Sequence, residues 1–210
     1  MLNRRFLAVA ALAAGLALAG CGKGAGAPGA ASSPAPSAGD MSLGDPAAKV
    51  KVIEYASASC SHCARFNNEV FPAFKAKYVD TGRVHYTLKE FLTPPVEVAA
   101  AGFLLARCTG KDRYFSTLDA VYKGQDAMFQ SGDFHGGLLA IAKAQGLSEA
   151  QFTACLSDKA AAQALSARAD KHVRDDKISS TPTFIVNGKN IGAGEMTLVQ
   201  LDAAIAEAAK

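Results

Sequence analysis

The sequence predicts an α/β fold in which a block of helices interrupts an alternation of strands and helices. Two short segments, 50–57 and 83–91, are typical of strands, whereas apolar residues through 96–177 recur with helical spacing. Near the C-terminus, Asn187-Gly188 is a strong short-range signal for a β-hairpin. The expected order is strand, helix, strand, helical block, hairpin and helix.

The first strand, 50–57, reads VKVIEYAS and alternates around β-branched residues, which is typical of a buried strand. A helix is expected from Cys63 onward, because the apolar residues then follow helical spacing. These residues are Phe66, Val70, Phe74 and Tyr78. Pro72 lies within this helix and is expected to kink it or to divide it into two.

The second strand, 83–91, is expected to end before Pro94 and Pro95. The helical block that follows is rich in alanine, with breaks expected at Gly110, Gly132 and Gly146. Within this block, Ser148 and Gln151 have the spacing of a capping box, which predicts that a helix begins there.

The last segment predicts two strands and one helix. Residues 181–191 read TPTFIVNGKNI, so the two strands are expected on either side of the Asn-Gly turn. Thr197 and Gln200 again have capping-box spacing and predict the start of an amphipathic helix that runs to about Ala208.

The N-terminus predicts export. Asn3, Arg4 and Arg5 form a basic start, and the apolar run 6–19 is shorter than the roughly 20 residues needed to cross a bilayer. The run ends in Leu-Ala-Gly before Cys21, which resembles the lipobox of bacterial lipoproteins. This resemblance implies a lipoprotein signal peptide over 1–20 and a lipid anchor on Cys21. The alternative is an ordinary signal peptide with a chance cysteine.

Residues 21–40 predict a tether and 41–210 a folded domain. After Cys21, the tether is almost entirely Gly, Ala, Pro and Ser, without aromatic or branched side chains to bury. The net charge of +3 falls to about +1 once Arg4 and Arg5 are removed with the signal. The sequence also lacks a basic groove with interleaved aromatics, so nucleic acid is not an expected partner.

The number of cysteines predicts two cysteine pairs. Of the five cysteines, lipidation of Cys21 leaves four, an even number in an exported chain. Three pairings are open, but the two-residue gap favours Cys60 with Cys63 and leaves Cys108 with Cys155. We expect the second pair to be a structural disulfide in the helical block; an electron relay or a regulatory pair is the alternative.

The motif CSHC, 60–63, lies where a strand turns into a helix. Unpaired N–H groups and the helix dipole stabilise an anion there, so the pKa of Cys60 should be lowered. Cys63 is placed to attack a mixed disulfide at Cys60, and a protonated His62 would add positive charge beside the thiolate. A zinc half-site lacks two further ligands, and a purely structural disulfide would close too small a loop to stabilise much.

Taken together, these features resemble the thioredoxin-fold thiol-disulfide oxidoreductases, specifically the DsbA-like branch with an inserted all-helical domain. The resemblance rests on CSHC after VIEYAS, the insertion at about 95–177, TPTFIVNG and the final helix. It implies a cis bond before Pro182 and a loop in which the backbone of Thr181 pairs with extended substrate. Local sequence alone favours an edge-strand proline.

Glu54 matches the buried acid of this family. A carboxylate within an apolar strand should have a raised pKa and relay the proton of Cys63, unless the side chain points outward. Lys89 and Glu90 are candidates for a neighbouring ion pair. Two departures concern the oxidising strength: Ser61 replaces the proline of the strongest oxidants, and Thr181 replaces an aliphatic residue.

The leading hypothesis is a lipid-anchored oxidase at the periplasmic face of a bacterial membrane. It would donate the Cys60–Cys63 disulfide to reduced exported proteins and be reoxidised by a membrane redox partner, without a cofactor or a resident metal. We expect a monomer, because 22–40 cannot supply the dimerisation domain of family isomerases. The alternatives are a reductase or isomerase, and a noncatalytic module binding a soft metal ion through Cys60, Cys63 and His62.

Overall fold

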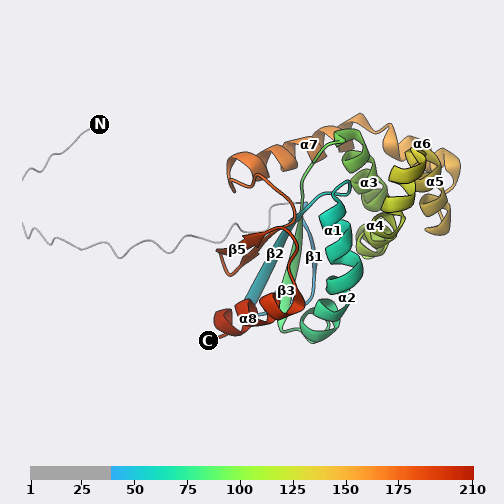
Figure 1. Ribbon diagram of the computed structural model, residues 1–210. Helices are drawn as coiled ribbons and strands as arrows, with labels where there is room; N and C mark the ends of the chain where they lie inside the picture. Colours follow the sequence, from blue (N-terminus) through green and yellow to red (C-terminus); the bar gives the residue numbers. More distant parts are fainter. Residues whose placement is uncertain (1–38) are drawn as a thin grey trace, which may run out of the picture. The chain divides into compact units, whose positions relative to one another are not determined.

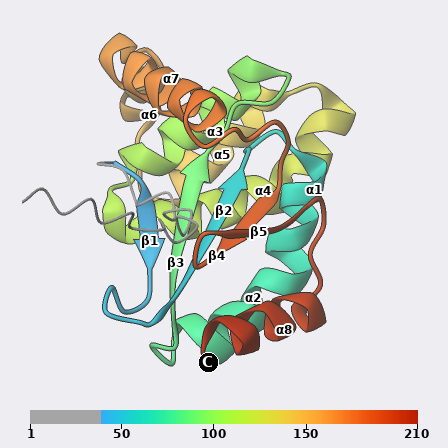
Figure 2. The ribbon, with the colours of Figure 1, turned by 90° about the vertical axis from the view of Figure 1, so that its left-hand side faces the viewer.

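The computed structural model describes residues 39–210 of the chain, so the expected signal peptide, the lipidation site Cys21 and most of the tether lie outside the described residues. A five-stranded sheet with the order β1-β3-β2-β4-β5 forms the centre (Figures 1 and 2). Its strands are β1 (Met41–Leu43), β2 (Val50–Ala56), β3 (Val84–Glu90), β4 (Thr183–Val186) and β5 (Lys189–Ala193). Strands β2 and β3 are parallel, and the other pairs are antiparallel.

The short edge strand β1 was not predicted, and the fold begins earlier than the composition indicates. Gly39 and Asp40, assigned to the tether by sequence, belong to the folded domain. The Gly39 carbonyl accepts a hydrogen bond of 2.7 Å from Arg107. The buried Asp40 carboxylate lies 3.7 Å from Nε2 of His172. Small and polar residues therefore enter the fold through long-range contacts that composition does not reveal.

The helix after Cys60 is continuous but changes its winding. It consists of α1 (Ser61–Arg65), a π-helical turn η1 (Phe66–Val70), α2 (Phe71–Phe74) and a second π-helical turn η2 (Lys75–Val79). Pro72 lies in the first turn of α2, where its missing N–H needs no partner. The wider turn before Pro72 thus accommodates the proline, and the helix is distorted rather than divided.

Five helices lie between β3 and β4. They are α3 (Val96–Cys108), α4 (Tyr114–Ser131), α5 (Phe134–Ala144), α6 (Glu149–Leu156) and α7 (Lys159–Arg174), with a single 3₁₀ turn η3 (Lys111–Arg113) before α4. The predicted breaks at the three glycines and the capping box at Ser148 are confirmed. The separation of α6 from α7 was not predicted; Asp158 caps α7 by accepting from the Ala161 N–H at 3.0 Å.

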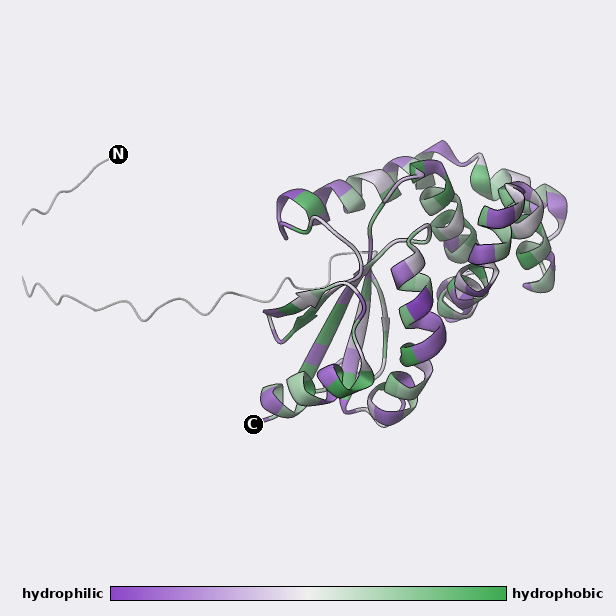
Figure 3. Cartoon of the chain, viewed as in Figure 1, coloured by the Kyte–Doolittle hydropathy of each residue, from purple (hydrophilic) through white to green (hydrophobic). Residues whose placement is uncertain are grey.

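The alternation of β2 divides the core between the two faces of the sheet. Val52 and Ala56 face the large cluster formed with the helices, including the final helix α8 (Leu198–Ala208). Ile53 and Tyr55 face a smaller cluster on the opposite side. Figure 3 shows the corresponding pattern on the helices, where hydrophobic and hydrophilic residues alternate along the turns. The hairpin predicted around Asn187 and the capping box at Thr197 are both confirmed.

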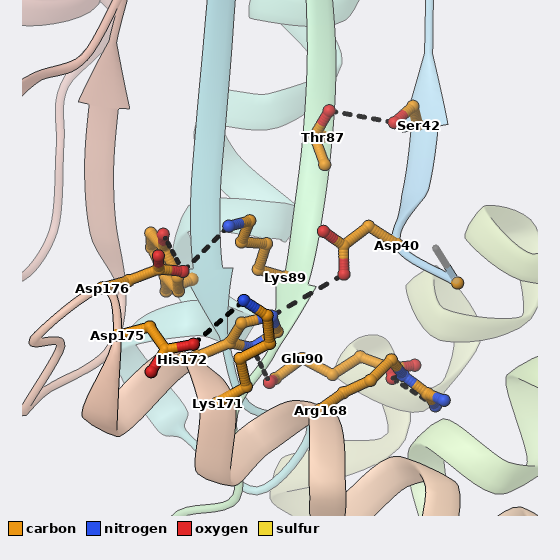
Figure 4. A network of polar contacts seen from close by, with 12 residues as sticks. Asp40, Ser42, Thr87, Lys89, Glu90, Arg168, Lys171, His172, Asp175 and Asp176 are labelled. Carbon is orange, nitrogen blue, oxygen red and sulfur yellow. Dashed lines mark hydrogen bonds and ion pairs between the residues drawn. The ribbon is translucent and has the colours of Figure 1, made fainter. Parts of the chain in front are cut away.

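A buried polar seam joins the helical insertion to the sheet (Figure 4). The suggested ion pair between Lys89 and Glu90 is wrong, because neighbouring residues of a strand point to opposite faces. Lys89 pairs with Asp176 at 2.8 Å. The Glu90 carboxylate instead binds Arg107 at 2.7 Å and Arg168 at 3.0 Å. This seam ties α3 and α7 to the end of β3, close to the start of the next loop.

Candidate active site

The cysteine pair lies at the junction of β2 and α1, as the sequence indicates. Cys60 is the N-cap of α1 and has extended backbone angles, with φ −86° and ψ 119°. Cys63 occupies the first turn and is completely buried, whereas Cys60 is half-buried. Both carry free thiols. Cys60 is therefore accessible from solvent, whereas Cys63 is not.

The surroundings of Cys60 favour its thiolate. The pKa of Cys60 is lowered to about 5, chiefly by a hydrogen bond from the Cys63 thiol, which outweighs the effect of partial burial. The Thr181 side chain also lowers this pKa. The backbone N–H groups of Cys63 and His62 add to the effect, as expected for a helix N-terminus.

The surroundings of Cys63 favour its protonated form. Burial raises the pKa of Cys63 well above the ordinary value, and the hydrogen bond to Cys60 raises it further. Below it, the Glu54 side chain is buried and accepts a 2.6 Å hydrogen bond from the Tyr86 hydroxyl. Burial raises the pKa of Glu54 to about 8, although the bond from Tyr86 acts in the opposite direction. Glu54 therefore points toward the core beneath α1 and not outward.

The loop before β4 faces the sulfur of Cys60. The Thr181–Pro182 peptide bond is cis, and the Cys60 thiol donates to the Thr181 carbonyl at 3.4 Å. The Pro182 carbonyl accepts a 2.8 Å hydrogen bond from the N–H of Gly194, which follows β5. A second cis bond, between Pro94 and Pro95, was not predicted.

His62 has a partner that the sequence did not suggest. Its Nδ1 lies 2.6 Å from the Glu195 carboxylate, which also accepts a 2.7 Å hydrogen bond from Arg65. Glu195 belongs to the loop between β5 and α8, and all three side chains are substantially exposed. The imidazole is therefore paired with a carboxylate, while the backbone of the same residue acts on Cys60.

Residues from the helical insertion hold the loop before Cys60. The buried Gln125 side chain of α4 donates to the Ala58 carbonyl at 2.8 Å and to the Cys60 carbonyl at 3.4 Å. Gly102 of α3 packs so closely that a Cβ atom at this position would lie 2.7 Å from the Cβ of Ala58. Sequence reasoning missed both residues, because neither belongs to a local motif and their partners lie more than 40 positions away along the printed sequence.

The remaining two cysteines form a disulfide within the helical insertion. Cys108, the last residue of α3, is bonded to Cys155 of α6, with 6.1 Å between their Cα atoms. The two bonded cysteines are separated by 47 positions in the sequence. This pair is thus already oxidised in the structure that carries Cys60 and Cys63 as thiols.

The fold and the cysteine pair together define a DsbA-like thioredoxin fold, with an all-helical domain inserted between β3 and β4. The predicted fold class is confirmed. The chain belongs to the thioredoxin family: residues 37–207 match the family described as Thioredoxin.

Known relatives agree with this assignment. A Rickettsia bellii protein named "Putative protein-disulfide oxidoreductase" is 34% identical over 150 residues, which are 71% of this chain and 57% of the relative. The chain thus spans little more than half the length of such curated relatives. The crystal structure of alpha-DsbA1 from Wolbachia pipientis has a TM-score of 0.73 and 28% identity, covering 82% of this chain and 92% of that one. Oxidised BdbD from Bacillus subtilis shares the fold, with a TM-score of 0.71, 20% identity and coverage of 80% and 92%.

Proposed function

We propose that the protein is a thiol-disulfide oxidoreductase that transfers the Cys60–Cys63 disulfide to substrate proteins through a mixed disulfide at Cys60. The single observation that carries this proposal is the asymmetry of the pair. Cys60 is accessible with a pKa lowered to about 5, whereas Cys63 is buried with a raised pKa. The thiolate is the nucleophile and the better leaving group, so the pair has one exchanging and one resolving sulfur.

The proposed reaction begins with attack by a substrate thiolate on the Cys60 sulfur. The Cys60–Cys63 bond breaks, a substrate–Cys60 bond forms, and Cys63 leaves as a thiolate that takes a proton from Glu54. A second substrate thiolate then attacks the substrate sulfur of the mixed disulfide and releases the Cys60 thiolate. The substrate is oxidised by two electrons, and the cysteine pair is reduced. Thr181 and Pro182 are proposed to bind the extended substrate backbone.

The proposed setting is the periplasmic face of a bacterial membrane, with the lipid on Cys21 as the anchor. This setting is supported by the resemblance of residues 1–21 to an export signal that ends in a lipobox. Reduced exported proteins are the proposed substrates, a membrane redox protein the proposed reoxidant, and the monomer the proposed functional unit. Within residues 39–210, no helix has the length and apolar character needed to cross a membrane.

The deciding experiment is the reduction potential of the pair, measured by equilibration with glutathione and thiol trapping. A disulfide donor is expected near about −120 mV, because stabilisation of the Cys60 thiolate makes the disulfide oxidising. A value near about −270 mV would instead indicate a reductant and reverse the proposed electron flow. Cys63→Ser is the companion variant; it should accumulate the mixed disulfide at Cys60, and Cys60→Ser should form none.

A further inference from the structure

Tyr122 of α4 has a buried hydroxyl group that lacks a hydrogen-bond partner among the described residues. The side chain is 3% exposed. A buried polar group without a partner costs free energy, so its presence requires a reason. Burial raises the pKa of Tyr122 well above the ordinary value, and the nearby Cys63 and Glu54 contribute to this shift. The hydroxyl therefore remains protonated and lies close to the groups that exchange a proton.

A small inner cavity and an outer groove both border Tyr122. The inner cavity has a volume of about 10 Å³, and its polar lining comprises Glu54, Tyr86, Asn67 and Tyr122. The outer groove has a volume of about 130 Å³ between α1 and α4 and is lined by Ser61 and other polar residues. Tyr122 is the residue common to both linings. Tyr122 thus borders both the cavity lined by Glu54 and the groove lined by Ser61, the residue that follows Cys60.

The inner cavity matches a single water molecule in size and chemistry. A water needs roughly 10–15 Å³ of such volume and two to four polar partners. Glu54 and Tyr122 both line the cavity, and a carboxyl group and a hydroxyl group can offer a water an acceptor and a donor. A water at this position would also give the Tyr122 hydroxyl the partner that the protein does not provide.

We propose that Tyr122 relays protons in both directions between Glu54 and the outer groove, through one water molecule in the inner cavity. This inference rests on the proposed function, in which Glu54 exchanges a proton with Cys63. Proton exchange through hydroxyl groups and waters needs such a continuous path from the buried acid to solvent.

The relay is required most when the reduced protein is reoxidised. The Cys60 thiolate first attacks the disulfide of the oxidant and forms a mixed disulfide, which releases one thiolate. Glu54, protonated at pH 7 because its pKa is about 8, must lose its proton through the relay before it accepts the proton of Cys63. The Cys63 thiolate then attacks Cys60, the intramolecular disulfide forms, and the second thiolate leaves. Two electrons pass to the oxidant, and the proton of Cys63 remains on Glu54.

The charged groups around the path define its pH dependence. On the inner side these groups are Glu54, Cys60 and Cys63, together with the tyrosines Tyr86 and Tyr114. On the outer side they are Arg65, Glu69, Lys123 and Asp126. The outer groove therefore contains two cations and two carboxylates, so the charge near the exit is balanced at neutral pH.

The test follows the two chemical steps separately in Tyr122→Phe. The reduced full chain is mixed with excess oxidised glutathione, quenched in acid at short times and analysed by mass spectrometry. The attack of Cys60 should keep its wild-type rate, because the pKa of Cys60 does not depend on the relay. Closure of the Cys60–Cys63 disulfide should slow about tenfold at pH 7, which is less than the usual effect of one acid–base group because Tyr122 acts on the proton only indirectly. The equilibrium potential should be unchanged.

Tyr114→Phe is the matched control, because Tyr114 is a buried tyrosine of the same helix whose hydroxyl bonds to Glu90 at 3.0 Å. It should leave the closure rate unaffected. Wild-type closure in Tyr122→Phe, with a wild-type pH profile, would overturn the relay. Absence of any mixed disulfide at Cys60 in the wild-type chain would overturn the proposed function instead. Tyr122→Met is a second variant without the hydroxyl, in case the phenylalanine variant does not fold.

Discussion

At the scale of single residues, Glu195 offsets the positive charge nearest the reactive sulfur. It binds His62 and Arg65 of α1 at 2.6 and 2.7 Å, and these contacts, His62 first, lower the pKa of Glu195. Ser61 is one expected influence on the proposed oxidising strength, and the pairing of His62 with Glu195 is a second candidate. It comes from a loop that is more than 130 residues away along the chain.

We predict that Glu195→Gln lowers the pKa of Cys60. Removal of the carboxylate leaves the positive charge of Arg65 unbalanced near the thiolate, and nearby cations favour an anion. The effect should be small, because the three side chains are exposed and screened by solvent. Thiolate absorbance during a pH titration measures it. Glu149→Gln, which breaks an exposed pair with Lys143, is the control and should change nothing; a raised pKa of Cys60 in Glu195→Gln would contradict the prediction.

The sequence located the site residues that belong to local motifs. Cys60 and Cys63 follow from their spacing and from the helix that begins between them, and Glu54 and Pro182 follow from the family resemblance. Glu195, Gln125 and Tyr122 have no such signal, because each acquires its role from contacts that only the completed fold brings together. Long-range pairing of single polar side chains is not encoded by periodicity.

At the scale of elements, α3 supports the active-site loop through close packing. We predict that Gly102→Ala destabilises the protein by about 1–3 kcal/mol, because the new methyl group overlaps Ala58 and overpacking is costly. Denaturant unfolding measures the change. Gly124→Ala in α4 is the matched control: its methyl group would have its nearest neighbour at 3.6 Å, so the helix should be unaffected or slightly stabilised. Equal stabilisation of both variants would disprove the close packing.

The disulfide between α3 and α6 is expected to act on stability and not on exchange. We predict that replacing Cys108 and Cys155 together by alanine lowers the free energy of unfolding by up to about 4 kcal/mol, as loop-closure entropy gives for a loop of 47 residues. Thermal unfolding measures this loss, and the rate of glutathione exchange at Cys60 should remain that of the wild type. Unchanged stability with altered exchange would favour a relay or regulatory role.

Elements with strong local signals were predicted, and those without them were not. The glycine breaks, the two capping boxes and the Asn-Gly hairpin all rest on interactions within a few residues, and all are present. Strand β1 has three residues and exists only because β3 pairs with it. The π-helical turns on either side of Pro72 were not predicted either, because periodicity indicates that a helix is present and not how it is wound.

At the scale of the whole molecule, the two redox forms should respond differently to pH. The pKa of Cys60 is lowered to about 5 in the folded reduced protein, so this group stabilises the fold above its ordinary pKa of 9.0 and loses that contribution as the pH falls toward 5. The disulfide form lacks this contribution. Glu54 acts in the opposite sense: its raised pKa removes stability as the pH rises from 4.5 to about 8.

We therefore predict that the melting temperature of the reduced protein rises relative to that of the oxidised protein between pH 5 and pH 9. The difference should be on the order of 5 °C, which allows for solvent screening at the partly exposed Cys60. Differential scanning calorimetry of both forms across this range measures it. Reduced Cys60→Ser should lose the rise, and a difference that stays constant or falls in the wild type would refute the assignment.

The pairing of β2 with β4 determines at which stage of folding Cys60 becomes reactive. Val52 at the centre of β2 is paired with Val186, so the loop bearing Thr181 joins the cysteines only after the entire helical insertion has been synthesised. Contacts of such long sequence separation form late, because closing the intervening loop costs entropy first. A partly synthesised chain would therefore carry Cys60 as an ordinary thiol, and its activation would coincide with completion of folding.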